Sequence, residues 1–338
     1  MSMKPRPEFA INIGGHKVRL GGRTLILGVL NVTPDSFSDG GLYFTPEAAI
    51  ERGAELVRQG ADWVDVGGES TRPGSQPISA EEELRRVLPV IRGLRRKLPS
   101  LPISIDTTKA EVAEQALDAG ASIVNDVSGL RFDPRLADVA RRHRAPLILM
   151  HLRGRPETMQ QAPFARDIWR SLMRGLETSI RRALAAGVDR SQIILDPGLG
   201  FGKSRRQNYE ILAGLEKLRR FRLPVLVGSS RKSFVKAVVG GEGLDPSRPG
   251  ALTAAPHASL RKSRSKRPRP THWPILGAPS DASGHIDGAH AHDLAPLLIG
   301  DAATVVAAIL GGAHLVRVHD PSAVLPAVRI ADALLAAH

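Results

Sequence analysis

The chain has 338 residues, of which 42% are apolar, so it can bury a large core as one barrel or as two ordinary domains. It contains no cysteine, which excludes disulfides and thiolate metal sites, and we expect it to work in a reducing cytoplasm. No apolar run is long enough to span a membrane, and residues 1–9 lack the hydrophobic stretch of a signal peptide. The net charge of +13 is compatible with nucleic acid and with small anionic substrates as partners.

Short apolar runs rich in Val, Ile and Leu alternate with longer segments of helical periodicity, which predicts strand–helix units with a parallel sheet. The predicted strands are Leu25–Leu30, Trp63–Val66, Ile103–Ile105, Ser122–Val124, Leu147–Met150, Ile193–Leu195, Val225–Val227 and Leu315–Val318. The helices expected to follow them are Pro46–Gln59, Ala80–Lys97, Ala110–Ala119, Pro134–Arg142, Ala165–Ala186, Asn208–Leu218, Asp301–Leu310 and Pro321–Ala337. Eight such units predict a single-domain α/β protein, a (β/α)8 TIM barrel, with an open doubly wound sheet as the alternative.

Nearly every predicted strand ends on a side chain that can do chemistry. In chain order these ends are Asn31, Asp65 with Gly67-Gly68-Glu69, Asp106, Asn125-Asp126, His151, Asp196, Ser230-Arg231-Lys232, and Arg317 with His319. A single such residue is explained equally well as a helix cap or the start of a turn. Because the strand ends of a barrel meet on one face, eight of them in register favour an active site there.

Two glycine-rich loops carry further signals. The segment Gly67–Ser75 combines backbone freedom with a hydroxyl and a guanidinium, which is typical of a loop that closes over phosphate oxygens and also of a plain surface loop. The segment Asp196–Ser204 is not a phosphate-binding P-loop, because Pro197 occupies the position of its first glycine. We expect its glycines to turn the chain sharply and to expose Phe201 and Lys203 at the barrel mouth.

The last two predicted strands are followed by basic residues. Ser230–Ser233 precedes an apolar segment, so its backbone N–H groups can lie at a helix start and receive an anion, although basic residues are also common on solvated surfaces. Strand alternation puts Arg317 and His319 on the same side of the last strand, where they can bind pyrophosphate. A single histidine at such a place more commonly has a structural role.

Seven motifs in order resemble those of the dihydropteroate synthase family, whose members form (β/α)8 barrels. The motifs are Asn31–Gly41, Glu69–Ser75, Ser104–Thr107, Asn125–Val127, Asp196–Lys203, Ser230–Ser233 and Arg317–Asp320. The resemblance covers nearly the whole chain outside Gly241–Leu297. It implies a transferase that condenses 7,8-dihydropterin-6-ylmethyl diphosphate with p-aminobenzoate, giving 7,8-dihydropteroate and pyrophosphate. It also implies a homodimer.

The resemblance further implies three groups of binding residues. The pterin pocket is implied at Asp106, Asn125, Asp196 and Lys232, whose acceptors and donors match an amino-pyrimidinone edge. The diphosphate and Mg²⁺ site is implied at Asn31, Thr71, Arg72, Arg317 and His319, with the Asn31 oxygen as the protein contact of the metal. The p-aminobenzoate pocket is implied at Phe37, Pro73, Phe201 and Ser233.

In the implied mechanism, carbon–oxygen cleavage expels pyrophosphate and leaves a cationic methylene that the aromatic amine attacks, with no covalent enzyme intermediate. The implied catalytic residues are Asp35, Thr71, Arg72, Lys232, Arg317 and His319. Two alternatives stay open. A pterin-dependent methyltransferase shares the Asp and Asn contacts but does not need the diphosphate groups. A nucleic-acid-binding protein would use a basic insertion and leaves the seven motifs unexplained.

That insertion is the one region that departs from the family pattern. Residues 241–295 are basic and rich in Pro and His, and six of the eleven residues in Leu260–Pro270 are Lys or Arg. We predict a disordered insertion between strand seven and helix seven. Three interpretations remain: a solvated insertion without a catalytic role, which includes a misread coding segment; a polyanion-binding arm; and a lid or subunit contact on the catalytic face.

Overall fold

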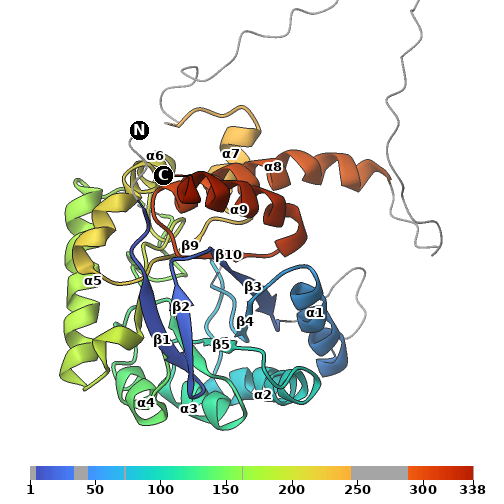
Figure 1. Cartoon of the computed structure of the whole chain (residues 1–338), viewed down its shortest axis with the longest axis vertical. Helices are drawn as coiled ribbons and strands as arrows, with labels where there is room; N and C mark the ends of the chain where they lie inside the picture. The colour runs from blue at the N-terminus through green and yellow to red at the C-terminus, as the bar shows by residue number, and fades with distance from the viewer. Residues whose placement is uncertain (1–4, 34–44, 72–73, 162, 245–287, 338) are drawn as a thin grey trace, which may run out of the picture.

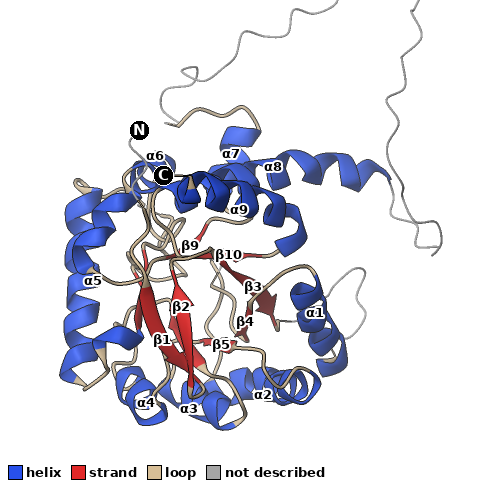
Figure 2. Ribbon diagram, viewed as in Figure 1, coloured by secondary structure: helices blue, strands red, loops and turns tan. Residues whose placement is uncertain are grey.

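The computed structural model describes residues 5–33, 45–71, 74–161, 163–244 and 288–337. In this part of the chain, parallel strands surround a common axis and helices cover the outside (Figure 1, Figure 2). The barrel strands are β3 Leu25–Asn31, β4 Trp63–Gly67, β5 Ile103–Asp106, β6 Ile123–Asp126, β7 Leu147–Met150, β8 Ile193–Asp196, β9 Leu226–Gly228 and β10 Leu315–Val318. The main helices are α1 Pro46–Arg58, α2 Ala80–Lys97, α3 Ala110–Asp118, α4 Leu136–His143, α5 Ile168–Ala185, α6 Arg205–Ala213, α8 Gly288–Leu310 and α9 Pro321–Ala336.

The order of the strands closes the sheet into a barrel. Strands β3 to β8 are neighbours in chain order, and β10 lies between β3 and β9. The last junction, between β8 and β9, is a parallel bridge of Leu195 with Val225, and Leu195 N donates to the Pro224 carbonyl at 2.9 Å. All eight predicted strands are present, so the predicted (β/α)8 barrel is confirmed and the open sheet is excluded.

Side-chain caps determine where several helices begin. The Ser79 hydroxyl accepts a hydrogen bond from Glu82 N at the start of α2, and Asp167 caps α5 in the same way. At α6, Ser204 and Gln207 form a reciprocal capping box. Each cap satisfies a backbone N–H that has no partner inside the helix, which stabilises the helix by about 1 kcal/mol.

The inward-facing side chains change from apolar to polar along the barrel axis. Side chains two residues apart on a strand point to the same face, and four strands carry an apolar residue followed two positions later by a polar one. These pairs are Trp63 and Asp65, Ile123 and Asn125, Ile194 and Asp196, and Leu315 and Arg317. The apolar members belong to one buried cluster that fills the amino-terminal half of the barrel. The polar members lie above it, at the carboxyl ends of the strands.

A β-hairpin that the sequence analysis did not identify closes the amino-terminal end of the barrel. Strands β1 Phe9–Ile13 and β2 His16–Leu20 pair antiparallel, and Gly14 and Gly15, with φ of +57° and +87°, form the turn. The hairpin's Ile11, Ile13 and Leu20 are buried in the same cluster as the lower layer of the barrel interior.

Three differences concern the second half of the chain. The predicted helix Asn208–Leu218 is present but its end is wrong, because α6 ends before Gly214 and a 3-10 helix, η3 Leu215–Phe221, follows it. A short helix, α7 Ser233–Val239, comes after β9. Helix α8 begins at Gly288, inside the predicted insertion, whose residues 245–287 lie outside the described residues. Among the described residues, no helix is long and apolar enough to cross a membrane.

Candidate active site

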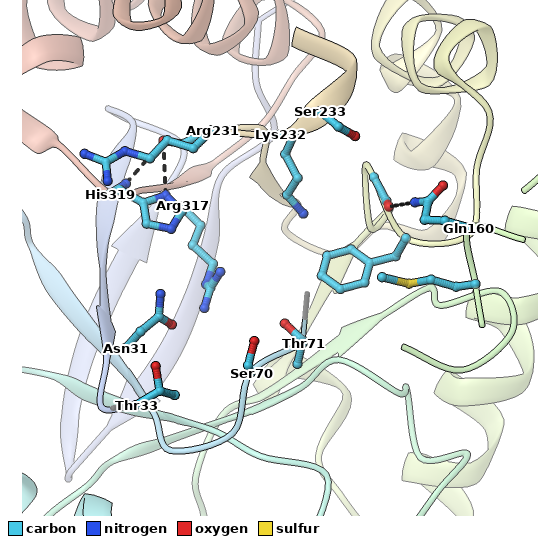
Figure 3. A pocket seen from close by; sticks show the side chains of 14 residues that line it. Asn31, Thr33, Ser70, Thr71, Gln160, Arg231, Lys232, Ser233, Arg317 and His319 are labelled. Atoms are coloured by element: carbon cyan, nitrogen blue, oxygen red, sulfur yellow. Dashed lines mark hydrogen bonds between the residues drawn. The ribbon is translucent and has the colours of Figure 1, made fainter. Parts of the chain in front are cut away.

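A cavity of about 460 Å³ opens at the carboxyl ends of the strands, which is the size of a small-molecule site. Figure 3 shows that side chains from opposite sides point into it, with Asn31, Thr33, Ser70 and Thr71 facing Arg317 and Lys232. The lining includes seven of the residues that the sequence analysis assigned to substrate or metal: Asn31, Thr71, Phe201, Lys232, Ser233, Arg317 and His319. The predicted convergence of strand ends on one face is therefore observed for these residues.

Arg317 connects the cavity to the polar layer of the barrel. Its Nε donates to Asp65 Oδ2 at 2.6 Å, and its Nη2 donates to Asp106 Oδ2 at 2.8 Å. Asn125 Nδ2 donates to the same oxygen of Asp65 at 3.0 Å. In this structure the guanidinium thus lies between two carboxylates, one of which is a predicted pterin residue.

Asp65 is the residue of this network to which the sequence analysis gave no role. Its side chain is fully buried, and its Oδ1 has no hydrogen-bond partner among the described residues. The sequence did contain a signal for an inward-facing Asp65. The carboxylate stands in the middle of the apolar strand β4, two residues before Gly67, and residues two apart on a strand face the same side. A buried carboxylate is retained at low cost only if it is paired, and Arg317 provides the pair.

Burial dominates the electrostatics of this layer. It raises the pKa of Asp106 to about 8, with the Asp65 charge adding to the rise and Arg317 opposing it. The pKa of Asp196 is also raised by burial, although Gly198 N donates to its Oδ1 at 2.6 Å. Burial depresses the pKa of Arg317, but the two carboxylates outweigh that effect, so its pKa rises overall and its charge is secure.

Lys232 and Phe201 form the opposite wall of the cavity. Lys232 Nζ donates to the Leu199 carbonyl at 2.7 Å and lies 3.9 Å from the centre of the Phe201 ring, a cation–π contact. Burial lowers the pKa of Lys232 to about 7, and the charge of Asp196 opposes this shift. Gly200 has a φ of +83°, and a Cβ there would meet Lys232 Cδ at 2.8 Å, so the close approach of loop and lysine requires glycine.

The expectation that Lys203 is exposed at the barrel mouth is wrong. Its side chain is 2% exposed, and its Nζ donates to the carbonyl oxygens of His151, Gly198 and Phe201 at 3.0, 2.7 and 3.0 Å. An ammonium has three donors, and all three are used to hold the turn that follows β8. Phe201 is also buried, at 9% exposed, so the expected exposure is wrong for it as well, although its side chain does line the cavity.

A buried acid helps to fix the β9–α7 turn, which carries Lys232, next to His319 at the end of β10. Asp301 on α8 accepts hydrogen bonds from Ser230 Oγ at 2.9 Å and from Arg231 N at 3.0 Å. Ser230 Oγ in turn lies 3.3 Å from His319 Nδ1, a contact drawn in Figure 3. The turn that carries Lys232 and the strand end that carries His319 are therefore held in a fixed relation.

The loop after β4 is anchored at its base. Lys109, which precedes α3, bonds to Glu69 in this loop and, at 2.6 Å, to the fully buried Glu83 of α2. Residues 72 and 73 of this loop lie outside the described residues, and four predicted site residues are not placed: Asp35, Phe37, Arg72 and Pro73. The roles assigned to these four residues stay predictions.

Two cavity residues, Met159 and Gln160, had no signal in the sequence. They come from the connection between β7 and α5, which contains none of the seven motifs. Met159 is buried in a small cluster with Phe201, and Gln160 Nε2 donates to the Gly200 carbonyl at 2.7 Å. Their position depends on the folding of this connection against the β8–α6 loop.

The donor set is compatible with Mg²⁺ held by one protein ligand. Asn31 is at the end of β3 and lines the cavity, so its amide oxygen can face a metal there. The described residues contain no cluster of three or more His, Asp, Glu or Cys side chains able to hold a metal. Other ligands would have to come from substrate phosphates and water, which is the usual manner of Mg²⁺.

Comparison with known proteins gives consistent matches. The model of the pterin binding enzyme family matches residues 27–262. The dihydropteroate synthase of Synechocystis sp. is 42% identical over 314 residues, which are 93% of this chain and 91% of that protein. A Yersinia pestis dihydropteroate synthase in a sulfonamide drug complex aligns with a TM-score of 0.76 and 33% identity over 98% of this chain and 100% of its own. A Xanthomonas albilineans dihydropteroate synthase with 4-aminobenzoic acid has a TM-score of 0.75 and 35% identity, over 98% of this chain and 99% of its own.

A closed (β/α)8 barrel with a buried acid–amide–guanidinium layer below an open cavity defines the class, and the family match identifies that class as the pterin-binding enzymes. Within it, the chain belongs to the dihydropteroate synthase family. The resemblance seen in the sequence motifs is thereby confirmed. The matches favour the synthase over the methyltransferase and over a nucleic-acid-binding protein.

Proposed function

We propose that the chain condenses 7,8-dihydropterin-6-ylmethyl diphosphate with p-aminobenzoate, giving 7,8-dihydropteroate and pyrophosphate. The proposal rests on the order in which chemical groups follow one another along the barrel axis. Hydrogen-bonding carboxylates and an amide lie inside the barrel, with cationic side chains above them around one cavity. A pterin with a diphosphate tail has the matching order of groups.

The inner layer suits the pterin ring. Asp106, Asn125 and Asp196 are at most 8% exposed and offer acceptors and one amide to the amino-pyrimidinone edge. Because Arg317 is bonded to Asp106 in this structure, pterin binding at Asp106 requires the guanidinium to share or release that carboxylate. Hydrogen bonds in so buried a site discriminate strongly, since a ligand that lacks them leaves the protein groups unpaired.

The cationic rim suits the diphosphate. Arg317, His319 and Arg231 line the cavity on one side, and Ser70 and Thr71 bring hydroxyls from the other. Positive charge there stabilises pyrophosphate as its negative charge grows during cleavage of the carbon–oxygen bond. Mg²⁺ bound near Asn31 would supply further charge stabilisation to the leaving group.

The wall formed by Phe201, Lys232 and Ser233 suits p-aminobenzoate. The aromatic ring of the substrate can pack against Phe201, and its carboxylate can approach the N–H groups near Ser233. The amine nitrogen then attacks the methylene carbon, forming the carbon–nitrogen bond, while the electron pair of the broken bond leaves with pyrophosphate. The ammonium product loses one proton to solvent or to pyrophosphate.

The first experiment follows pyrophosphate release and dihydropteroate formation by the purified chain with Mg²⁺, with and without p-aminobenzoate. We expect release coupled to product, and Asp106→Asn should raise the KM for the pterin diphosphate. Folded protein that forms no dihydropteroate would refute the proposal. Titration with EDTA and restoration by Mg²⁺ tests the metal, since activity that survives chelation would exclude it.

A homodimer is part of the same proposal. Helices α8 and α9 lie side by side (Figure 1). Each carries a large exposed apolar side chain, Ile299 of α8 at 70% and Ile330 of α9 at 63%. Light scattering should give twice the chain mass, and Ile299→Glu with Ile330→Glu should give a monomer. Leu184→Glu on α5, at an exposed apolar position elsewhere, is the matched control and should leave the mass unchanged. A monomeric wild-type protein would contradict this assignment.

A further inference from the structure

The connection between β7 and α5 touches both loops that border the cavity. Gln160 Nε2 donates to the carbonyl of Gly200 in the β8–α6 loop at 2.7 Å, and Gly74 N in the β4–α2 loop donates to the Pro156 carbonyl at 3.4 Å. The connection has its own internal turns, since Met159 N and Thr158 N both donate to the Arg155 carbonyl, at 2.7 and 3.1 Å. It is therefore a folded segment that links the β4–α2 loop on one side of the cavity to the β8–α6 loop on the other.

The Gln160 bond acts on the peptide directly before Phe201. The Gly200 carbonyl and the Phe201 N–H belong to one planar unit, so fixing the carbonyl also fixes the start of Phe201. That unit is held at both ends, because Phe201 N donates to the Gly198 carbonyl at 3.2 Å. On the preceding peptide, Gly200 N donates to Asn208 Oδ1 at 2.6 Å. Gln160 supplies the contact on the cavity side, as Figure 3 shows.

The Phe201 ring, in turn, is fixed between two partners that line the cavity. Met159, adjacent to Gln160 in the chain, is 5% exposed and packs in the same apolar cluster as Phe201. On the other side, Lys232 Nζ lies 3.9 Å from the centre of the ring. A shift of the Gly200–Phe201 peptide would therefore move the ring relative to Lys232 and change the shape of this wall.

We propose that Gln160 is a positioning residue for the second substrate: its amide holds the Gly200–Phe201 peptide and so sets the Phe201 wall against which p-aminobenzoate packs. The inference rests on the proposed function and assigns part of its specificity to a segment outside all seven motifs. Gln160 donates to the Gly200 carbonyl, whereas Asn125 and Asp196 of the pterin layer bond to Asp65 and Gly198, so we expect the KM for p-aminobenzoate to change more than the KM for the pterin diphosphate.

The test compares three variants in steady-state kinetics, with each substrate varied in turn. Gln160→Met keeps the length of the side chain and removes the donor, and Gln160→Glu replaces the donor with an acceptor that repels the Gly200 carbonyl. Gln161→Glu is the matched control, because it makes the same chemical change one residue further on, at an exposed position. Melting temperatures of all three variants report whether the barrel is intact.

We expect both Gln160 variants to raise the KM for p-aminobenzoate by about threefold to tenfold, which is the factor that one ordinary hydrogen bond supplies. The KM for the pterin diphosphate should change less than about twofold, and Gln161→Glu should match the wild type. A merely structural role would raise both KM values together or lower the melting temperature, and either result overturns the proposal. If the wild type is active and the Gln160 variants have unchanged kinetics, only the role of Gln160 is refuted. If the wild type is inactive, the proposed function is refuted together with the role of Gln160.

Discussion

Replacing Arg317 with methionine tests whether this guanidinium holds the polar layer of the barrel together. Arg317 bonds to Asp65 at 2.6 Å and to Asp106 at 2.8 Å, and the side chains of these acceptors are 0% and 9% exposed. The variant leaves two acidic side chains in a buried site without a cation between them; Asp106, whose pKa burial already raises to about 8, can take up a proton, whereas the Asp65 carboxylate loses its partner. Removing one partner from a buried ion pair costs about 3–5 kcal/mol.

The expected loss is large enough to measure by scanning calorimetry. With an unfolding entropy of about 2.1 cal/mol/K per residue, it lowers the melting temperature of a chain of this length by roughly 4 to 7 °C. Adding Asp65→Asn to Arg317→Met removes the unpaired carboxylate and should recover part of the loss. The two substitutions should therefore be non-additive, as expected for residues in direct contact.

Ser104→Ala is the matched control for these variants. Ser104 lies opposite Asp65 in the β4–β5 register, is fully buried, and its hydroxyl has no partner among the described residues. Removing a hydroxyl that makes no bond should change the melting temperature by less than about 1 °C. Arg317→Met melting as the wild type does, or a double variant whose two losses simply add, would refute the role of Arg317 as the shared counter-ion.

Three further predictions follow from buried groups and a tight turn. Burial lowers the pKa of Lys232 to about 7, so its ammonium is lost above that pH; the KM for the pterin diphosphate should rise from about pH 7 to 9, and Lys232→Arg should flatten the rise. Burial lowers the pKa of His314 to about 4, so between pH 6.5 and 4 this histidine takes up a proton only in the unfolded chain. Urea titrations should therefore show the free energy of unfolding fall by about 3 kcal/mol on acidification, and by less in His314→Gln. Gly198→Ala, with φ of +64° and a Cβ 2.2 Å from the His151 carbonyl, should lower the melting temperature by several degrees, whereas Gly22→Ala, with no atom near its Cβ, should not.

The barrel could be predicted from the sequence because its strands are continuous apolar runs of uniform type. Each run is buried on both faces, so hydrophobicity alone marks it, and the polar residue at its end marks the catalytic face. The N-terminal hairpin was missed because β1 and β2 are short and only half apolar. The Gly14-Gly15 pair between two alternating segments was the available signal for it.

The predicted residues that line the cavity lie at a strand end or in the loop that directly follows one. Asn31 and Arg317 are of the first kind, and Thr71, Phe201 and Lys232 are of the second. Lys203 and Gln160 show where this reasoning fails, since their partners are backbone carbonyls. Every residue has a backbone carbonyl, so the sequence does not show which carbonyl will be the partner. The burial of Lys203 and the orientation of Gln160 therefore depend on loop conformations that composition does not encode.

The inward-facing side chains of the barrel change from an apolar lower layer to a polar upper layer, so the same strands both stabilise the fold and orient a substrate. The lower layer packs like an ordinary core, with Trp63 and Leu315 buried, so the fold does not depend on the charged layer for its main hydrophobic stabilisation. Two residues further along the same strands, Asp65 and Arg317 face each other. Because the strands fix these positions, the carboxyl groups of Asp65 and Asp106 lie deep, Arg317 reaches from them to the cavity, and Lys232 and His319 line the cavity itself. A substrate with a hydrogen-bond-donating ring and an anionic tail therefore has one favourable orientation. We therefore expect pterins without the diphosphate to keep the ring contacts and lose the rim contacts, which makes them competitive inhibitors with respect to the pterin diphosphate; purely non-competitive inhibition would contradict the proposed orientation.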